Sequence, residues 1–329
     1  MLDQKLEIVS SLSDQARTNL DLLKSVEESW QPTDFLPDLT KESWRDDLQK
    51  LREGAAALPD ALLVILVGTM VTEEALPSYQ TSFNRLPGVN DPTGASAEPW
   101  AQWSRGWTAE ENRHGDLLNR YLYTTGRVDM RAVEVTIQHL IRNGFDPLHD
   151  NDPYNGLVYT SLQERATKVS HQKVGQLAKK AGEGVLGQIC ATIAGDEARH
   201  EEGYKRFMAR IFEADPSGAV VAFRTMLERN IVMPANLMYD GQNPTLFSAF
   251  SLTAQKNGVY TFEDYLQIID HFIEYWKVKD LKGLTGEAAE AQDKVCEIPR
   301  QLGRRIKFMS ARANAKSVTP FRWIHGRPV

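Results

Sequence analysis

The chain has 329 residues, of which 42% are hydrophobic and 25% charged, and its net charge is −6. This composition suits a globular protein with a sizeable core, and the acidic balance argues against a general nucleic-acid binder, which needs a basic face. The cysteines Cys190 and Cys296 are far apart, which excludes a disulfide scaffold or cysteine-based metal site and fits a reducing compartment. The longest mainly apolar run, 61–71, is too short for a membrane span of roughly 20 residues.

Helical periodicity dominates the sequence, and no alternating strand pattern runs for more than a few residues. The breaks between periodic segments contain Gly, Pro, Asn and Asp, as helix boundaries usually do. No low-complexity linker divides the chain, so we expect a single all-α domain over 1–329, with a short hairpin in the irregular last stretch, 319–329. The predicted helices are 3–27, 42–57, 60–85, 97–124, 129–143, 153–181, 184–213, 216–231, 243–256, 261–277 and 285–313.

The third predicted helix, 60–85, carries Glu73 on its apolar stripe. Pro77 follows four residues later and cannot donate a hydrogen bond to the Glu73 carbonyl. The helix should therefore kink or locally unwind there. We expect this distortion to help direct the Glu73 carboxylate inward.

The next predicted helix contains WTAEENRHGD, in which Glu111 and His114 stand three residues apart. The same spacing recurs as Glu197 and His200 in AGDEARHEE, on the helix predicted over 184–213. On a helix this spacing places both side chains on one face. One such pair is a weak signal in a chain with seven histidines, but two copies on two long helices are a stronger one.

A second lone glutamate, Glu164, lies on the apolar stripe of the helix predicted over 153–181. The chain order is therefore Glu, Glu-x-x-His, Glu, Glu-x-x-His, which resembles an internal repeat of antiparallel helices. Taken singly, Glu73 or Glu164 is better explained as a solvated helix residue and His114 as a core histidine. His171 follows Glu164 by two turns and leaves an outer role at the site open, and the remaining histidines are assigned a structural role (His139, His149, His271 and His325).

The six residues together predict a metal site in a four-helix bundle. Four ionised carboxylates in a dry core would repel one another strongly, and two divalent cations offset that charge. Mixed carboxylate and imidazole ligands suit iron or manganese better than zinc. One Glu from each of two helices plus Glu-x-x-His from two others is the ligand set of ferritin-like di-iron proteins. The bundle helices would be 60–85, 97–124, 153–181 and 184–213.

At these residues the chain resembles the soluble acyl-acyl carrier protein (acyl-ACP) desaturases of the plant stearoyl type. The resemblance covers most of the chain in family order, with hardly a gap. The matching stretches are WQPTDFLPD (30–38), VTEEALPSYQT (71–81), TGAS (93–96), WTAEENRHGDLLN (107–119), GRVDMR (126–131), YTSLQERAT (159–167), DEARHE (196–201), MPANLMYDG (233–241), GVYTFEDY (258–265) and WKV (276–278).

The resemblance implies a homodimeric enzyme of about eleven helices with two iron ions per subunit. It would place a cis double bond, Δ9 by default, in a saturated acyl chain carried on acyl carrier protein, using O2 and two electrons from ferredoxin in fatty acid biosynthesis. The resemblance further assigns Thr167 to oxygen activation and proton delivery, and Trp30, Asp196 and His114 to an electron route from ferredoxin. The implied iron ligands are Glu73, Glu111, His114, Glu164, Glu197 and His200.

Two stretches depart from the plant Δ9 pattern at positions that line or flank the family's substrate channel. Ser82, Phe83 and Arg85 are unusual in the first stretch, and Asn155 and Leu157 in the second. Chain length or double-bond position can therefore differ from the default of Δ9 on an 18-carbon chain.

Acyl carrier protein is acidic, and so is this chain, so docking would need a local basic patch. We expect Arg199 to point outward, with Lys24, Lys205 and Arg206 as possible neighbours, while the basic run 300–316 is a rival patch. The compartment stays open between a plastid stroma and a bacterial cytoplasm, and Met1 directly before the first predicted helix favours the cytoplasm.

Two other functions use a comparable site. A ferroxidase or iron-storage protein is typically a single short bundle, whereas this chain has several further predicted helices. A ribonucleotide reductase small subunit usually has Asp as its first ligand with a radical-bearing Tyr nearby, and here the first ligand is Glu73. Both stay as alternatives to the desaturase interpretation.

Overall fold

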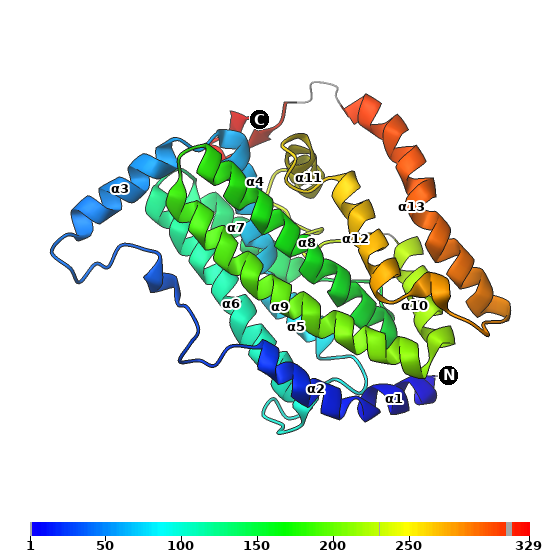
Figure 1. The fold of residues 1–329 in the computed structure, drawn as a ribbon. Coiled ribbons are helices and arrows are strands. Elements are labelled where there is room, and N and C mark those ends of the chain that lie inside the picture. The colour runs from blue at the N-terminus through cyan, green and yellow to red at the C-terminus, as the bar shows by residue number, and fades with distance from the viewer. Residues whose placement is uncertain (1, 230, 314–317) are drawn as a thin grey trace.

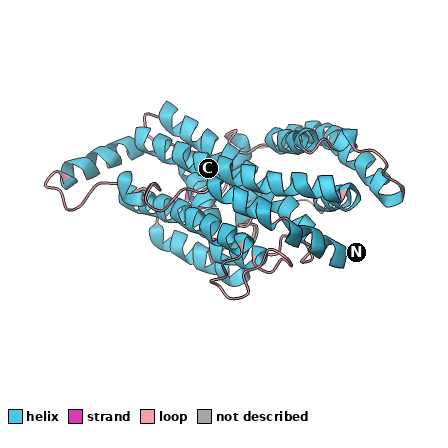
Figure 2. Ribbon diagram, turned by 60° about the horizontal axis from the view of Figure 1, so that its bottom comes forward, coloured by secondary structure: helices cyan, strands magenta, loops and turns pink. Residues whose placement is uncertain are grey.

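The structure, a computed structural model, describes residues 2–229, 231–313 and 318–329. Helices make up nearly all of its regular elements (Figures 1 and 2). The α-helices are α1 (Leu2–Ser11), α2 (Ser13–Asn19), α3 (Trp44–Ala56), α4 (Asp60–Glu73), α5 (Leu76–Phe83), α6 (Pro99–Thr125), α7 (Met130–Asn143), α8 (Pro153–Lys180), α9 (Gly184–Ala214), α10 (Pro216–Glu228), α11 (Leu246–Lys256), α12 (Phe262–Tyr275) and α13 (Gly286–Ala313). Short 3-10 helices are η1 (Leu20–Leu22), η2 (Pro32–Asp34), η3 (Val278–Asp280) and η4 (Arg322–Ile324).

Four helices form a bundle at the centre of the molecule. Both α4 and α9 pack against α6 and α8, so the four helices close around a common interior. Figure 1 shows α6, α8 and α9 running side by side through the molecule, with α10, α12 and α13 on one flank. The predicted all-α fold is confirmed by this arrangement.

The ends of the bundle helices follow local rules. Helix α6 has Pro99 in its first turn and ends at Gly126, whose φ of 66° suits glycine at a left-handed C-terminal position. Helix α8 also starts with a proline, and the Asp152 side chain accepts hydrogen bonds from the backbone N–H groups of Tyr154 and Asn155. These signals explain why predicted and observed boundaries of α6 and α8 agree within two residues.

Helix α4 is apolar on all sides, and every residue from 62 to 73 is buried. It is a core helix of the bundle, and its last residue is Glu73. No single described helix is long and apolar enough to cross a membrane; α3 and α4 meet that test only as a pair bent by 111°.

The helix predicted over 60–85 is divided into α4 and α5, as the position of Pro77 led us to expect. Helix α4 ends at Glu73, and Pro77 lies in the first turn of α5, where the missing N–H removes no intrahelical bond. The local unwinding is confirmed, although the result is two helices rather than one kinked helix.

The prediction of one helix over 3–27 is wrong. The segment forms α1, α2 and η1, and the backbone becomes extended at Leu23. The Lys24 N–H donates to the Glu110 side chain at 2.8 Å instead of to a helix carbonyl. A tertiary hydrogen bond thus overrides local helix propensity. With the division of 60–85, this gives thirteen α-helices in the described residues instead of about eleven.

The short C-terminal hairpin is confirmed: β1 (Pro320–Phe321) pairs antiparallel with β2 (Arg327–Pro328). Between the strands, the Trp323 indole N–H donates to Thr136 Oγ1 on α7 at 2.9 Å. The Arg327 guanidinium also pairs with Asp60 at the start of α4, so the hairpin holds α4 and α7 together. Most of the basic run 300–316 lies outside the residues whose side chains are described.

Candidate metal centre

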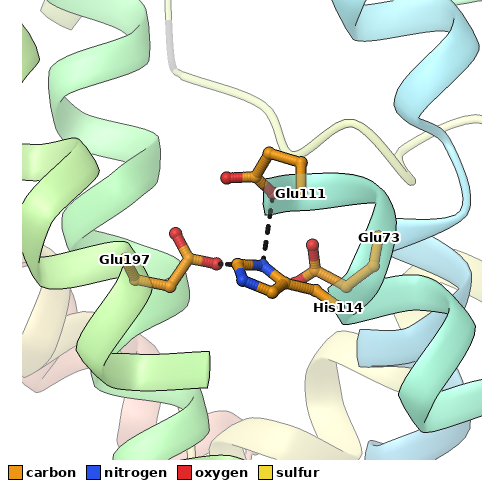
Figure 3. A group of neighbouring side chains, drawn as sticks. All are labelled: Glu73, Glu111, His114 and Glu197. Carbon is orange, nitrogen blue, oxygen red and sulfur yellow. Dashed lines mark ion pairs between the residues drawn. The ribbon is translucent and has the colours of Figure 1, made fainter. Parts of the chain in front are cut away.

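The six predicted ligands meet inside the bundle, and each is at most 4% exposed. Helix α4 contributes its terminal Glu73 and α8 contributes Glu164, while α6 and α9 each contribute a Glu-x-x-His pair. Two groups of four are formed, and within each group one ligand atom per residue lies within 4.8 Å of the others. The groups are Glu73, Glu111, His114 and Glu197 (Figure 3), and Glu111, Glu164, Glu197 and His200. Glu111 and Glu197 belong to both groups and so stand between two potential ion positions.

Several inward-facing atoms of the cluster lack hydrogen-bond partners. Glu111 Oε1 and His200 Nδ1 are 2.8 Å apart, yet neither makes a hydrogen bond of normal geometry within the described residues. A buried polar atom without a partner costs about 1–3 kcal/mol, so five together need an explanation. The other three such atoms are His114 Nδ1, Glu164 Oε2 and Glu197 Oε1. Metal ions between these oxygen and nitrogen atoms would satisfy all of them, so the residues fit a two-metal centre.

Protonation in the cluster is strongly perturbed. Burial raises the pKa of the Glu164 carboxyl well above its usual value, and burial also raises that of Glu73. Burial raises the pKa of Glu111 too, but the charges of the two histidines outweigh this effect and leave it below its usual value. The carboxyl without a strong partner is thus held neutral by burial, whereas the one between two imidazoles is held ionised.

The pKa values of the His114 and His200 imidazoles are shifted in the same direction. Burial lowers the pKa of each imidazole, but the surrounding carboxylates outweigh it and leave both pKa values well above normal. Nearby carboxylates include Glu111 at His114, and Glu110 and Glu111 at His200. Without a cation, the imidazoles are therefore the groups that supply positive charge to this interior.

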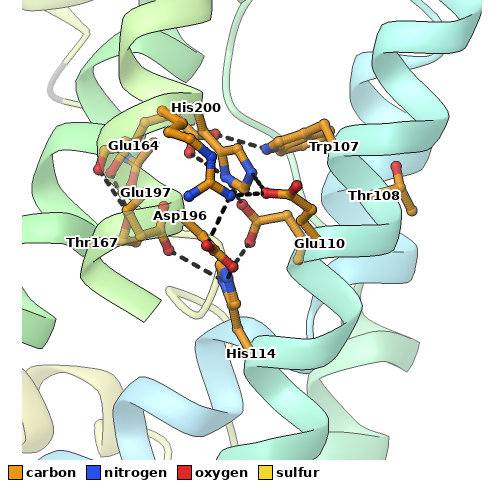
Figure 4. A network of polar contacts seen from close by, with 12 residues as sticks. Trp107, Thr108, Glu110, His114, Glu164, Thr167, Asp196, Glu197 and His200 are labelled. Carbon is orange, nitrogen blue, oxygen red and sulfur yellow. Dashed lines mark hydrogen bonds and ion pairs between the residues drawn. The ribbon is translucent and has the colours of Figure 1, made fainter. Parts of the chain in front are cut away.

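Each histidine turns one nitrogen toward the cluster and the other toward an outer carboxylate (Figure 4). His114 Nδ1 lies 3.4 Å from Glu111, and its Nε2 lies 3.3 Å from Asp196. His200 Nε2 lies 3.0 Å from Glu110. An outer carboxylate that accepts the Nε2 proton leaves Nδ1 free as a ligand, as is usual at metal sites.

Trp30, Asp196 and His114 are in direct contact, as the predicted electron route requires. The Trp30 indole N–H donates to Asp196 Oδ2 at 2.9 Å. The Trp30 ring also stacks on the His114 ring, with 6.1 Å between centroids and 8° between planes. The structure thus brings the three side chains together, and their role stays a prediction.

Four further residues surround the cluster that the sequence did not predict as part of the site. Glu110 and Arg113 are both buried, and they contact His200 and Asp196 respectively. The Trp107 indole N–H donates to Glu164 Oε1 at 3.1 Å, and the Tyr79 hydroxyl lies 3.4 Å from Glu111. The signal for Glu110 and Arg113 was in the sequence, because EENRH and DEARH share an acid before the Glu and an arginine before the His.

His171, whose role the sequence left open, lies 3.0 Å from Glu73 Oε1 through its Nε2. The imidazole is buried, as is the carboxylate. His171 therefore holds one oxygen of Glu73, the residue that α4 contributes to the first group.

Two cavities meet at the cluster. The larger, of about 710 Å³, lies between α4, α8, α11 and α12. The smaller, of about 60 Å³, is lined by Glu111, Glu164 and Glu197 together with apolar and aromatic side chains. Both cavities are lined by Thr72, Glu73, Gln163 and Thr167. Thr167 thus lies at the junction, where its hydroxyl donates to the Gln163 and Glu164 carbonyls of its own helix.

Two of the residues that depart from the family pattern, Ser82 and Phe83, line the small cavity. Ser82 and Arg85 line a third pocket, which shares His149 with the small cavity. Neither Asn155 nor Leu157 lines the three cavities found in the described part of the chain, but Gly156 between them lines the small cavity, so both positions flank it. Asn155 donates from its side-chain amide to the His149 carbonyl.

The proposed basic docking patch is mostly engaged in ion pairs. Arg199 was expected to face outward, but its guanidinium binds Glu110 and Asp196 at 2.7 and 2.8 Å. Lys205 and Arg206 both pair with Glu202, although the Arg206 side chain is 40% exposed, and Lys24 is exposed as well. The outward prediction for Arg199 is therefore wrong, because the outer carboxylates of the histidines attract it inward.

A four-helix bundle with two Glu-x-x-His helices, two further glutamates and this buried cluster defines the class of ferritin-like carboxylate-rich metal proteins. Within that class the assignment is specific. A family model for fatty acid desaturase matches residues 4–325, and the chain belongs to this family.

Relatives of known name agree with the family assignment. The chain is 52% identical to a chloroplastic acyl-(acyl-carrier-protein) desaturase of Cucumis sativus, over 100% of this chain and 83% of the relative. It is 53% identical to the chloroplastic stearoyl-(acyl-carrier-protein) 9-desaturase 5 of Oryza sativa subsp. japonica, over 99% and 84%. The crystal structure of DesA2 from Mycobacterium tuberculosis H37Rv shares the fold, with a TM-score of 0.53, 18% identity and coverage of 84% and 97%.

Proposed function

We propose that the chain is an acyl-ACP desaturase, an oxidoreductase of fatty acid biosynthesis. It would place a cis double bond in a saturated acyl chain, Δ9 by default, with O2 and two electrons. The observation that carries the proposal is the path of two joined cavities, which brings an extended apolar substrate past the buried carboxylate and histidine cluster. The identity of about half of all positions to acyl-ACP desaturases over the full chain favours this function over a ferroxidase or a ribonucleotide reductase subunit.

The cofactor we propose is a pair of Fe2+ ions held by the six predicted ligands. The outer carboxylates Glu110 and Asp196 are matched by the guanidiniums of Arg113 and Arg199, so this outer set is neutral. The negative charges of the four inner glutamates then remain. Two divalent cations would balance them, with the neutral imidazoles as further ligands. The full set is Glu73, Glu111, His114, Glu164, Glu197 and His200.

Bound iron would supply the oxygen activation and hydrogen abstraction that no side chain can perform. The side chains of the protein would exclude water, position the substrate and deliver a proton. Burial of the cluster would exclude water, and Thr72, Gln163 and Thr167 line both cavities beside Glu73, where the substrate would pass. Walls that hold the acyl chain would fix which methylene pair faces the site, and such positioning is a large part of selective catalysis. We assign the Thr167 hydroxyl, which lines both cavities, to proton delivery.

The polar side chains of Ser82 and His149 line both the small cavity and the third pocket beside it. His149 Nδ1 accepts a hydrogen bond from the Asn151 N–H at 3.0 Å, so its Nε2 carries the proton and donates to Ser82 Oγ at 2.9 Å. Burial lowers the pKa of His149, which favours this neutral form. We propose that this pair meets the methyl end of the substrate and makes the preferred chain length differ from that of the plant Δ9 enzymes.

Electrons would arrive one at a time from ferredoxin at Trp30, which is half-buried and touches both Asp196 and His114. Acyl carrier protein would present the substrate. We further propose that residues 1–329 form one desaturase domain, supported by the family match over 4–325, and that the subunit forms a homodimer. A cytoplasmic location is preferred, with a plastid stroma as the alternative.

The test uses iron-loaded protein, reduced ferredoxin, O2 and a series of saturated acyl-ACP thioesters of different chain length. Mass spectrometry of the released fatty acids should show a product two hydrogens lighter, with one double-bond position. A Glu197→Ala variant gives the matched control, since Glu197 belongs to both metal groups. Absence of unsaturated product from protein that holds two irons would contradict the proposal.

A further inference from the structure

Arg199, the residue before His200 on α9, binds the outer carboxylates of both histidines. Its Nη2 donates to Glu110 Oε2 at 2.7 Å and to Asp196 Oδ1 at 2.8 Å. We infer that Arg199 is a positioning residue that fixes both metal-facing imidazoles at once, by clamping the two carboxylates that orient them. The inference rests on the proposed function, because it concerns the same metal centre.

The clamp is possible because the outer contacts cross between the two helices. Glu110 on α6 faces His200 on α9, whereas Asp196 on α9 faces His114 on α6. Each carboxylate is thus one helix away from the imidazole it orients. A single guanidinium that holds both carboxylates also holds α6 and α9 at a fixed separation across the centre.

Arg199 is itself held in place by backbone carbonyls. Its Nε donates to the Leu22 carbonyl at 2.8 Å, and its Nη1 donates to the Gly195 carbonyl at 3.3 Å. The side chain is 24% exposed, so the guanidinium is partly desolvated and its bonds to carboxylates are correspondingly stronger than at the surface. A planar fork with several donors can make these four contacts together, which an ammonium group cannot.

The corresponding arginine on α6, Arg113, does not act in the same way. Its Nη2 is 3.5 Å from Asp196, and its Nη1 donates to the Trp30 carbonyl at 2.6 Å. No bond from Arg113 to Glu110 is found in the described residues. Among the described residues, Asp196 therefore has three donors besides His114, whereas Glu110 has only Arg199 and the Lys24 N–H besides His200.

This asymmetry gives the inference a specific consequence. Loss of Arg199 leaves Glu110 with one backbone donor, so the orientation of His200 should suffer more than that of His114. Outer partners of this kind typically contribute about 10–100-fold to metal affinity. The second metal group, which contains His200, should therefore weaken first.

The decisive experiment measures Co2+ binding to metal-free protein, by absorption titration under nitrogen. Wild-type protein should take two equivalents. Arg199→Gln should lower the affinity for one equivalent by about 10–100-fold. The same loss of Co2+ affinity should appear in a His114→Ala background, where His200 supplies the one imidazole of the centre. Arg206→Gln, on the same helix and paired with Glu202, is the matched control and should bind as wild type.

A conservative variant and a double variant separate positioning from fold stability. Arg199→Lys keeps the charge but not the fork, so full recovery of Co2+ affinity would overturn the clamp. If Arg199 acts on His200 through Glu110, then Arg199→Gln combined with Glu110→Gln should bind no worse than the weaker single variant. Fully additive losses would contradict the inference, as would a lower melting temperature of metal-free Arg199→Gln with unchanged Co2+ binding.

The two proposals fail in different ways. If wild-type protein does not bind two equivalents of Co2+, the metal assignment itself fails. If wild type binds two equivalents and Arg199→Gln binds them equally well, the clamp is refuted while the proposed function stands.

Discussion

The segments EENRH (110–114) on α6 and DEARH (196–200) on α9 share a pattern but not their surroundings. In both, the inner glutamate belongs to both metal groups and the histidine turns Nδ1 inward. The two copies differ in the residue that follows the histidine: Gly115 on α6 and Glu201 on α9. The comparison teaches that the repeated residues build the centre, while the neighbouring residues adapt each copy to a different packing partner.

Gly115 allows α6 to pass close to the end of α4. A Cβ at this position would lie 3.4 Å from the Glu73 carbonyl carbon and from the Glu74 nitrogen. These contacts leave room for a methyl group but not for a larger side chain. The close approach brings the terminal residue of α4, Glu73, within reach of the first metal group.

Glu201 joins α9 to α8 and α12. Its buried carboxylate pairs with Arg165 at 2.6 Å and with Lys168, both on α8, and lies 3.3 Å from His271 on α12. Burial opposes ionisation of this carboxyl, but the surrounding donors outweigh it and lower its pKa to about 2. The second copy therefore carries a structural ion-pair network directly beside a ligand.

The largest effect should come from the glutamates that the two groups share. Glu111→Ala removes a ligand from both groups, so bound iron should fall from two per chain to well below one, with loss of desaturation. Glu73→Ala affects only the first group and should leave about one ion. Iron analysis of purified protein checks both values, and retention of two ions in either variant would refute the ligand assignment.

The shared-ligand variants need a check on folding. Removing Glu111 leaves the two protonated imidazoles of the metal-free cluster with one counter-charge fewer, so metal-free Glu111→Ala should melt lower than metal-free wild type but stay folded at the temperature of the iron measurement. Asp116→Ala, at an exposed position on the same helix, should keep two ions.

A smaller effect should follow from the outer carboxylates, and it tests the crossed contacts. Asp196→Asn should weaken the group that contains His114, and Glu110→Gln the group that contains His200, each by about 10–100-fold in metal affinity. Titrations in His114→Ala and His200→Ala backgrounds identify the group concerned. If each variant affected the histidine on its own helix instead, the crossed arrangement would be wrong.

Glu201→Gln should destabilise the fold without removing a ligand. The amide keeps one acceptor but loses the charge that faces Arg165 and Lys168, so unfolding should become easier by about 1–3 kcal/mol. Urea denaturation of metal-free protein measures this change. Glu202→Gln, next along the helix but more exposed, should cost under about 1 kcal/mol; equal losses for the two variants would argue against a special role of the buried network.

The smallest effect is expected at Gly115. Alanine fits the space beside α4 and is favoured over glycine in a helix by about 0.5–1 kcal/mol. Gly115→Ala should therefore leave stability unchanged or slightly higher, with two bound ions. Gly115→Leu should separate α6 from the end of α4 and reduce iron at the first group; normal iron content in that variant would disprove the need for a close approach.

The ligand set could be predicted from the sequence because its geometry is local. Residues three apart on a helix must share a face, so each Glu-x-x-His pair was readable before any tertiary contact was known. The position of Pro77 likewise revealed that the chain distorts after Glu73, because a proline cannot donate the helical hydrogen bond. Apolar periodicity placed Glu73 and Glu164 on buried faces. Four buried carboxylates would repel one another, and this repulsion indicated that cations bind between them.

Contacts between distant segments were decided only by the tertiary structure. Glu110 and His200 are 90 residues apart, and nothing in local periodicity indicates that they meet. For the same reason Arg199 was expected to face solvent, although two carboxylates from different helices draw it inward. The break of the helix predicted over 3–27 also depends on a distant partner, the Glu110 side chain that binds the Lys24 N–H.

The sequence by itself thus determined the all-α class, the six carboxylates and imidazoles that face inward and the distortion after Glu73, since helix geometry and proline chemistry act within a few residues. Tertiary structure alone decided which outer carboxylate serves which histidine, that Arg199 binds both, and where two cavities join beside Thr167. The reason is physical: periodicity tells which face of a helix is buried, but the identity of the partner on that face depends on how whole helices pack.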